Sequence, residues 1–561
     1  MTRKIAIVGA SKDTLSKTRI LDEYNNDKIT FVSINHISYS TSNGYDYYIE
    51  HSFFSSYEIQ TLAKKTAYTW YRDNNGIDRY PNHFSFGIAM QNRLELVLSN
   101  IIKYYFSFKK LLLKYDIVII PEDLNDNLEA IFTNLPDNYK KHKYSSNDFE
   151  NLNTMLDALG RCNNIIHVNK YSPIMYKLQK SLCLQKKQKT LIFPDWTYNH
   201  YRHKDYLYQN SKDIRKGFYF RNKNPNITKL RNKFPMNIEI NTRSLESVKD
   251  DMINNQDKKN LSEIFIKTIS NEYSKSIKNL CITYAILRDL LVDYEPKQVV
   301  CPTFHHHFHT ITAEIAREMN IKTSVVLDGY APHIDILYYS KDSSNLNYLF
   351  DNYVFTGSLA KDLTNKYFPE ITGDLIKMPL SDLIVNTSQK NENNYDAIIM
   401  TAYPLYGNPN SYYDLRFQYV IDIIKVLNKK NYKNIVIKVK NANREALARE
   451  VSLLENFLMA HSLDNMEICT GNLYDIVNDT KIIVGQATTA LIESNIANTP
   501  YYIYEPSYCG LSDNDIERSV FKDTYYARTS ADLEANIAMS RDSILDRNKL
   551  VDGSTMTDIL N

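Results

Sequence analysis

The chain has 561 residues, more than one hydrophobic core usually organises, so we expect at least two domains. Its 67 Lys and Arg residues nearly balance its 65 Asp and Glu residues, which argues against a nucleic-acid partner or a strongly acidic one. Its six cysteines include no C-x-x-C pair, which argues against a zinc knuckle or a disulfide framework and fits a reducing cytoplasm.

The amino-terminal residues lead directly into an expected strand at residues 4–8, with no apolar leader before it. A second strand is expected at residues 29–34, as in a nucleotide-binding α/β domain. The turn after the first strand holds a single glycine, Gly9, so the G-x-G-x-x-G fingerprint of dinucleotide-binding proteins is absent. No stretch of the chain is apolar for long enough to cross a membrane, so we expect a cytoplasmic protein.

Residues 57–115 show a mostly helical pattern that ends in the basic and aromatic run 103–114. Two interpretations fit this run: a helix lying on an anionic membrane surface, or a packed helix with a solvated lysine edge. Its nearly continuous apolar residues favour the packed helix. The strand expected at residues 116–120 leads to Glu122, and a carboxylate at the carboxyl end of a parallel strand faces the crevice where ligands bind.

Residues 195–280 are polar and partly helical in pattern, and we interpret them as an insertion within the amino-terminal domain. The insertion begins near Trp196 and His200, which either contact a sugar or form an ordinary loop cluster. Another strand is expected at residues 165–168, and a long helix at residues 261–291.

Four histidines lie between His305 and His309, directly after an expected strand at residues 298–301. A metal site would also need suitable geometry and usually a carboxylate or thiolate ligand, so we expect no metal. The other interpretations are a loop that presents His305 or His307 to a substrate, or a surface loop. The strand expected at residues 323–327 ends at Asp328, a second carboxylate at a strand end and a candidate catalytic group.

Strands and helices alternate again in the carboxyl-terminal half, which indicates a second Rossmann-like domain. The most linker-like stretch in the middle of the chain, residues 341–345, places the boundary there. We therefore expect an acceptor domain at residues 1–345, a donor domain at 346–540 and a tail at 541–561. Strands are expected at 353–356, 397–400, 434–439, 466–469, 481–484 and 501–504, and helices at 312–319, 358–367, 416–427, 444–460 and 474–478.

The stretch 481–505 has the pattern of a strand, a glycine turn, a helix and a second strand. Gly485 ends the first strand, and Thr488 and Thr489 stand where a helix would begin. Free backbone N–H groups and two hydroxyls at the positive end of a helix dipole can hold a phosphate. The alternative is an ordinary βαβ unit in which the threonines only cap the helix.

The order of these motifs in residues 298–505 resembles the GT-B glycosyltransferases of bacterial surface polysaccharides, a group that includes capsule and teichoic-acid polymerases and Kdo transferases. Asp328-Gly329 stands where that group often has His-Gly, residues 437–442 (IKVKNA) stand in place of its Lys-Pro-His-Pro, and residues 488–493 (TTALIE) in place of its last signature. The resemblance covers the carboxyl-terminal half well and the amino-terminal half only as topology. The missing histidine of Lys-Pro-His-Pro and the Asp in place of His depart from the pattern.

The resemblance implies an α/β fold of the GT-B type, in which two Rossmann-like domains face each other across a cleft and the amino-terminal domain carries a mostly helical insertion. The donor would bind the carboxyl-terminal domain, with Glu493 at the ribose and Tyr403 at the base or sugar. The residues implied at the donor's phosphate are Lys438, Lys440, Gln486, Thr488 and Thr489. Asp328 would be the catalytic base or nucleophile, with Glu122, His305 and His307 as further candidates.

The resulting expectation is a metal-independent glycosyltransferase with no cofactor. The first expected donor is CMP-Kdo or a related CMP-nonulosonic acid, followed by a UDP-sugar. The acceptor is a bacterial surface glycan or its lipid-linked precursor, with a peripheral contact at the inner membrane as one interpretation. The alternatives are a nucleotide-sugar epimerase or hydrolase of the UDP-GlcNAc 2-epimerase kind and a non-catalytic glycan-binding assembly protein.

Overall fold

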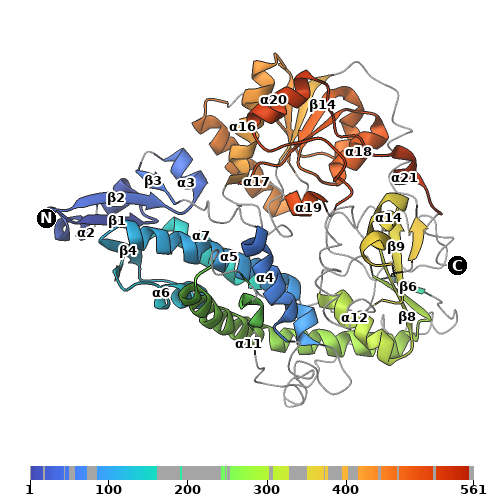
Figure 1. Ribbon diagram of the computed structural model, residues 1–561, viewed down its shortest axis with the longest axis horizontal. Coiled ribbons are helices and arrows are strands. Elements are labelled where there is room, and N and C mark those ends of the chain that lie inside the picture. Colours follow the sequence, from blue (N-terminus) through green and yellow to red (C-terminus); the bar gives the residue numbers. More distant parts are fainter. Residues whose placement is uncertain are drawn as a thin grey trace, which may run out of the picture.

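The computed structural model arranges the chain around three β-sheets, which we call the first, second and third sheets in chain order (Figure 1). Neighbouring strands are parallel in all of the pairs that the structure describes, so helical crossovers connect them and cover the sheet faces. The structure describes residues 2–16, 19–42, 44–49, 57–71, 85–160, 190–192, 240, 242–246, 248, 253–301, 307–326, 350–369, 371, 373–376, 394–401, 415–439, 444–463, 466–508, 513–517 and 519–554.

The first sheet lies at the amino-terminal end of the molecule and has the strand order β3-β2-β1-β4-β5. Its strands are β1 (Lys4–Val8), β2 (Lys28–Ser33), β3 (Tyr47–Tyr48), β4 (Ile117–Pro121) and β5 (Tyr139–His142). Its helices are α1 (Lys12–Leu15), α2 (Ile20–Glu23), α3 (His36–Thr41), α6 (Asp126–Thr133) and α7 (Asn147–Gly160). The central strands β1 and β4 are buried apolar runs, as a strand covered on both faces requires.

Long helices connect the first sheet to the second (Figure 1). They are α4 (Tyr57–Thr69), α5 (Phe86–Lys114), α11 (Asn255–Tyr294) and α12 (His307–Glu318), and a short 3₁₀ helix, η2 (Arg243–Leu245), lies against α4. The basic and aromatic run 103–114 belongs to α5, where Tyr105 and Phe108 are fully buried, so the packed-helix interpretation is confirmed.

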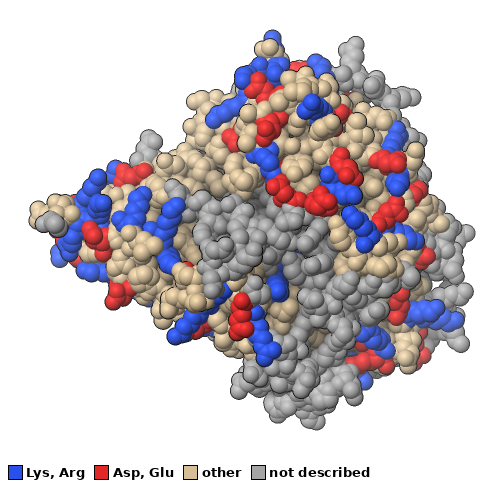
Figure 2. All heavy atoms as spheres, in the orientation of Figure 1, with Lys and Arg blue, Asp and Glu red and all other residues tan. Residues whose placement is uncertain are grey.

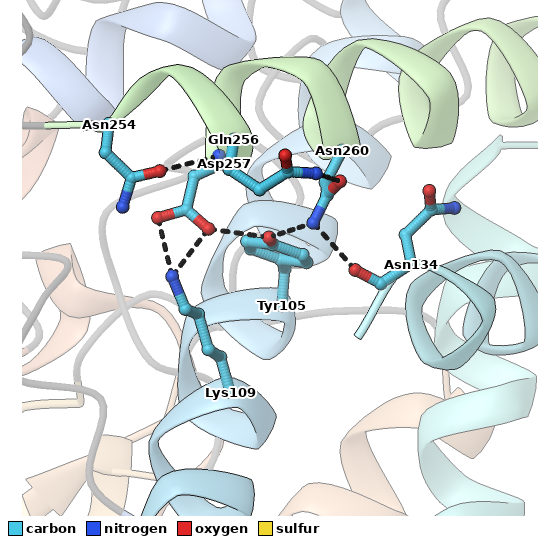
Figure 3. A network of polar contacts seen from close by, with 7 residues as sticks. All are labelled: Tyr105, Lys109, Asn134, Asn254, Gln256, Asp257 and Asn260. Atoms are coloured by element: carbon cyan, nitrogen blue, oxygen red, sulfur yellow. Dashed lines mark hydrogen bonds and ion pairs between the residues drawn. The ribbon is translucent and has the colours of Figure 1, made fainter. Parts of the chain in front are cut away.

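A polar network joins α5 to the first turn of α11 (Figure 3). The carboxylate of Asp257 accepts hydrogen bonds from the Lys109 ammonium at 2.6 and 2.7 Å and from the Tyr105 hydroxyl at 2.7 Å. Asn260 donates to the Tyr105 oxygen at 3.0 Å and to the Asn134 carbonyl at 2.8 Å. Burial is the main cause that raises the pKa of Tyr105, and its hydrogen bond to Asp257 adds to the effect. The network fixes α11 against α5 and the end of α6.

The second sheet has the order β10-β9-β8-β7-β6. Its strands are β6 (Thr190–Ile192), β7 (Gln298–Cys301), β8 (Lys322–Val326), β9 (Asn352–Thr356) and β10 (Gly373–Ile376), and α14 (Ser358–Tyr367) follows β9. Strand β9 pairs with β8 through Val325 and Tyr353, although the expected domain boundary at residue 345 lies between these two strands. The change to the third sheet therefore comes between β10 and β11, and two sheets precede it.

The third sheet has the order β13-β12-β11-β14-β15-β16. Its strands are β11 (Tyr395–Met400), β12 (Ile435–Lys438), β13 (Glu467–Cys469), β14 (Thr480–Gly485), β15 (Tyr501–Tyr504) and β16 (Tyr526–Ala527). Its helices are α16 (Arg416–Lys429), α17 (Arg444–Ala460), α18 (Thr489–Ala497), α19 (Asp513–Glu517) and α20 (Ser530–Ala538), with 3₁₀ turns η4 (Leu473–Asp475) and η5 (Val477–Asp479). The α/β class with Rossmann-like parallel sheets is thus confirmed.

The end of the described chain passes from the third sheet back to the second (Figure 1). Helix α21 (Arg547–Val551) contacts both α18 and α14. On the third-sheet side, the backbone N–H of Leu545 donates to the Asn495 side chain at 2.8 Å. On the second-sheet side, the Asp552 carboxylate accepts from the backbone N–H of Ser358 at 2.7 Å, at the start of α14. Residues 545–552 therefore tie the two sheets together.

Lys and Arg side chains are interspersed with Asp and Glu side chains over the third-sheet part of the face shown in Figure 2. This pattern agrees with the near balance of 67 basic and 65 acidic residues in the sequence. Among the helices in the described ranges, none combines the length and the apolar character that a membrane span needs.

Candidate functional site

The strand order of the third sheet creates one position where a ligand crevice is expected. The chain proceeds outward from β11 to β12 and β13 on one side, and from β14 to β15 and β16 on the other. This is the strand order of a doubly wound Rossmann sheet, whose ligands bind outside the carboxyl ends of the two strands where the direction reverses. In this sheet those ends are Met400 of β11 and Gly485 of β14. The candidate site therefore lies at the carboxyl ends of β11 and β14.

The turn from β14 into α18 begins at a crowded glycine. A Cβ atom on Gly485 would lie 2.1 Å from the Tyr501 hydroxyl oxygen and 2.8 Å from the Met400 Cβ atom. Only a residue without a side chain fits there, which lets the backbone of β14 pass close to β11 and β15. The predicted strand, turn and helix at residues 481–505 are confirmed by β14, α18 and β15.

The residues after Gly485 carry the polar groups of the turn. Thr488 is the N-cap of α18, and its hydroxyl accepts a hydrogen bond from the Ala490 backbone N–H at 3.3 Å. Thr489 is the first helical residue and is half-buried. The first N–H groups of a helix have no partner within the helix, so the backbone here is suited to an anion. The capping role of Thr488 is observed, and the role of Thr488 and Thr489 at a phosphate stays a prediction.

The N–H group of Ala487, just before the N-cap, already has a carboxyl partner. The Ala487 N–H donates to the Glu505 carboxylate at 2.6 Å, and Glu505 is fully buried just after β15. The side chain of Gln486 is also buried, and its carbonyl accepts from the Tyr501 hydroxyl at 2.6 Å. A phosphate at this turn would therefore use the N–H groups after Ala487.

Lys438 ends β12 beside the candidate site. The register of β12 against β11 places Lys438 opposite Met400, and the Lys438 carbonyl accepts a hydrogen bond from the Thr401 backbone N–H at 3.1 Å. The Lys438 side chain is 3% exposed, and its ammonium donates to the Val439 carbonyl. The sheet thus places a buried cation one strand away from β11, on the side opposite β14.

Glu493 lies within α18, where it is 2% exposed. Its side chain therefore does not face the surface of the molecule. Burial is the main cause that raises the pKa of Tyr501, and the carboxylates of Glu505 and Glu493 raise it further. Both acids consequently lie close enough to the Tyr501 hydroxyl to act on it electrostatically.

The other predicted site residues are distributed differently. Asp328, His305, Lys440 and Tyr403 lie outside the described residues, as do Trp196, His200 and the strand expected at 165–168. Glu122 follows β4 in the first sheet and is exposed, and its backbone N–H donates to the His142 carbonyl at 3.1 Å. His307 begins α12 and is 4% exposed, so it lies in a buried helical turn and not in an open loop.

The described part of the chain therefore brings together Lys438, Gln486, Thr488, Thr489 and Glu493 in the third sheet. Glu122 belongs to the first sheet and His307 to the helix next to the second sheet. Within the residues that the structure describes, no three His, Cys, Asp or Glu side chains are placed to hold a metal ion.

The first sheet has an equivalent crevice position, but the chain itself fills it. Its order reverses between β1 and β4, and the turn after β1 contains Gly9 with a φ of +77°. The Ser146 hydroxyl donates to the Gly9 carbonyl at 2.6 Å, and a Cβ on Gly9 would lie 2.7 Å from the Phe149 ring. The Tyr144 hydroxyl donates to the Val8 carbonyl at 2.7 Å. These contacts leave the third sheet as the better candidate for a ligand.

Sequence reasoning missed Tyr501 and Glu505. Glu505 is a carboxylate at the carboxyl end of a parallel strand, so the rule that selects Glu122 and Asp328 also selects it. Tyr501 gives no comparable signal, because one tyrosine among the chain's 44 does not stand out.

No protein-family model matches the sequence, and no curated protein matches it. Solved structures with a similar fold include the UDP-GlcNAc 2-epimerase of Methanocaldococcus jannaschii in complex with UDP-GlcNAc and UDP. Its sequence is 13% identical, the TM-score is 0.40, and the alignment covers 66% of this chain and 98% of that one. MurG of Acinetobacter baumannii is 9% identical, with a TM-score of 0.29 and coverage of 51% and 73%. The wall teichoic acid polymerase TagF is 10% identical, with a TM-score of 0.29 and coverage of 65% and 89%. At such low scores and identities, these similarities assign no activity to the chain.

Proposed function

We propose that the protein is a glycosyltransferase that uses a nucleotide-activated sugar, bound at the carboxyl ends of β11 and β14. The observation that carries this proposal is the turn from Gly485 to Thr489 at the point where the strand order of the third sheet reverses. Such a position is where α/β sheets bind nucleotides, and the start of α18 offers N–H groups to a phosphate. Lys438 supplies a positive charge at the same edge of the sheet.

The charges of the site suit a phosphate leaving group. When a glycosyl bond to a phosphate breaks, negative charge grows on the phosphate oxygens. A helix N-terminus stabilises such charge, and a buried ammonium does so more strongly than an exposed one because water screens it less. In this proposal Lys438 and the N–H groups of Thr488 and Thr489 stabilise the departing nucleotide. Glu493 accepts hydrogen bonds from the ribose, with Lys440 and Tyr403 as additional donor contacts.

The acceptor chemistry is assigned to the carboxylates and imidazoles of the amino-terminal half. Asp328 is the first choice for the group that deprotonates the acceptor hydroxyl or attacks the anomeric carbon, and Glu122, His305 and His307 are further candidates. The first proposed donor is CMP-Kdo or a related CMP-nonulosonic acid, followed by a UDP-sugar. The proposed acceptor is a surface glycan or its lipid-linked precursor, which would bring the protein to the cytoplasmic face of the inner membrane.

Thermal-shift measurements with CMP, CDP, UDP and GDP test the nucleotide site. A ligand that binds only the folded state raises its melting temperature, so at least one of the four should do so. Lys438→Met should weaken that shift. Lys481→Met is the matched control. Lys481 lies near the amino-terminal end of β14 and pairs with Asp396 of β11 at 2.6 Å, so it is at the opposite ends of the strands from the candidate site. If none of the four nucleotides shifts the wild type, the proposal is wrong.

The reaction itself is tested by nucleotide release from CMP- and UDP-sugars with and without a glycan acceptor. A transferase releases nucleotide faster when the acceptor is present, whereas an epimerase or hydrolase does not need it. Asp328→Ala should abolish the acceptor-dependent release while the nucleotide-induced thermal shift remains. If Asp328→Ala and Glu122→Ala both transfer sugar at the wild-type rate, the catalytic assignment fails.

A further inference from the structure

One peptide group in the turn after β14 is held at both of its ends. The carbonyl of Gln486 and the N–H of Ala487 belong to the same planar peptide unit, and they point in opposite directions when the bond is trans. The Tyr501 hydroxyl donates to the carbonyl at 2.6 Å, and the Glu505 carboxylate accepts from the N–H at 2.6 Å. Both side chains come from the β15 segment, so a single neighbouring strand fixes the orientation of this peptide.

The residues that hold the peptide are themselves firmly placed. Tyr501 and Glu505 are both 0% exposed. The backbone of Glu505 is fixed by hydrogen bonds from its own N–H to the Ala527 carbonyl at 2.9 Å and from the Arg528 guanidinium to its carbonyl at 2.7 Å. Neither side chain can move without breaking buried contacts. The orientation of the 486–487 peptide is therefore set before any ligand arrives.

Fixing this peptide has a chemical consequence for the turn. Thr488 and Thr489 continue directly from Ala487 into α18. The orientation of the 486–487 peptide, together with the φ and ψ angles of the residues that follow, therefore determines where the N–H groups of Thr488 and Thr489 point. The Glu505 carboxylate also takes the Ala487 N–H away from any incoming anion. A phosphate that approaches the turn meets the later N–H groups in one preset direction, which avoids the free-energy cost of ordering the loop upon binding.

We propose that Glu505 and Tyr501 are positioning residues for the phosphate of the bound nucleotide. This inference rests on the proposed function and adds to it the residues that shape the phosphate contact. Neither residue touches the nucleotide in this mechanism. Both act on the 486–487 peptide, and the Tyr501 hydroxyl also lies beside the Thr488 side chain. Because they hold the same peptide, their effects on phosphate affinity should not be additive.

The test compares phosphate-bearing ligands with the same ligands lacking phosphate, by isothermal titration of UDP against uridine and of CMP against cytidine. Glu505→Ala should weaken the nucleotide that binds the wild type by about tenfold or more and leave the nucleoside within about twofold. Glu505→Gln keeps an oxygen that can accept from the Ala487 N–H, so it should restore most of the affinity. Tyr501→Phe removes only the hydroxyl, and it provides a second, milder variant if Glu505→Ala does not fold.

Four outcomes decide the question. Loss of nucleotide affinity with unchanged nucleoside affinity, rescued by Glu505→Gln, supports positioning. Equal weakening of nucleotide and nucleoside together with a lower melting temperature indicates a purely structural role and overturns the inference. Nucleotide affinity at the wild-type level in both Glu505→Ala and Tyr501→Phe overturns it as well, while the proposed function stands. A wild type that binds none of CMP, CDP, UDP and GDP refutes the proposed function and this inference with it.

Discussion

The guanidinium of Arg416 pairs with the carboxylate of Glu450 at 2.7 Å in the interior of the third-sheet region, joining the start of α16 to α17. The Arg416 side chain is 2% exposed and that of Glu450 is 12% exposed. Burial raises the pKa of Glu450, and the opposing effect of Arg416 is smaller. The carboxylate therefore remains in a desolvated position that Arg416 only partly compensates.

Glu450→Ala leaves the Arg416 cation buried without this partner. Removing one member of a buried ion pair costs about 3–5 kcal/mol, so the free energy of unfolding should fall by about 3 kcal/mol in urea denaturation followed by circular dichroism. Glu534→Ala is the control, because it removes a partly exposed carboxylate that pairs with Lys429 and Lys430 at the surface of α16, and it should change the unfolding midpoint much less. Equal midpoints for the two variants would contradict the prediction.

Gly485→Ala should destabilise the turn after β14. The added Cβ atom would lie 2.1 Å from the Tyr501 hydroxyl oxygen and 2.8 Å from the Met400 Cβ, and such overpacking typically costs about 1–3 kcal/mol. Gly471→Ala is the matched control, since its Cβ would meet the Cys469 sulfur at 3.7 Å, an ordinary contact. Differential scanning fluorimetry should show a lower melting temperature for Gly485→Ala alone. The prediction fails if Gly471→Ala is the less stable of the two.

The buried carboxylate of Asp148 should make stability depend on pH. It accepts from the Ser33 hydroxyl at 2.8 Å and from the Ile34 N–H at 3.1 Å, but desolvation prevails and raises its pKa above the usual 3.8. A raised pKa means that the folded state binds the proton more tightly than the unfolded state. The stabilisation is complete below the unfolded pKa and is lost as the pH rises through the folded pKa.

The melting temperature of the wild type relative to Asp148→Asn should consequently fall as the pH rises from the usual Asp pKa through the raised folded-state pKa. Asp27 provides a control of opposite sign, because its hydrogen bond with Arg3 lowers its pKa. Relative to Asp27→Asn, the wild type should lose stability as the pH falls below the usual Asp pKa and through the lowered folded-state pKa. A pH profile for Asp148→Asn that runs parallel to the wild type would contradict the argument.

In the network between α5 and α11, Asp257 should contribute more to the free energy of unfolding than Tyr105 does (Figure 3). Asp257→Ala removes the acceptor of both Lys109 and Tyr105, so it should lower the free energy of unfolding by about 2–3 kcal/mol. Tyr105→Phe removes a neutral hydroxyl that donates to Asp257 and accepts from Asn260, but it leaves the Lys109–Asp257 pair, so it should cost about 1 kcal/mol. Gln256→Ala is the control for the start of the helix. Gln256 precedes Asp257 by one residue, and its side chain donates an exposed hydrogen bond to Asn260. Urea denaturation ranks the three variants, and a reversed order would refute the assignment.

The elements that sequence patterns predict well are those whose cores are made of local apolar runs. Strand β7 and helices α14 and α17 begin and end at the predicted residues, because β-branched runs and periodic apolar positions define them. Strand β5 has the sequence Tyr-Lys-Lys-His, and its edge position leaves two of those side chains exposed, so no apolar run indicates it. The short strands β3 and β16 carry too few residues to show any period.

The sequence predicts whether a segment is a helix or a strand better than it predicts which sheet a strand joins. The polar stretch at residues 341–345 suggests a boundary, yet β9 pairs with β8, because pairing between parallel strands depends on contacts far apart in sequence. The same limit applies to the candidate site. Gly485 and Thr488 could be selected from their local turn pattern, whereas the bond between Ala487 and Glu505 depends on the packing of β15 beside β14.

The link made by residues 545–552 limits how the second and third sheets can move. Its ends are anchored to different sheets, at Asn495 on α18 and at Ser358 on α14. A short link that is anchored at both ends fixes the distance between the two sheets but allows one sheet to rotate relative to the other. Opening by simple separation on this side would break the anchors, so a rotation about the link is the motion that costs least. The link is anchored at Asn495, near the carboxyl-terminal end of α18, whereas the turn after β14 precedes the amino-terminal end of that helix, so the turn would move with the third sheet during such a rotation.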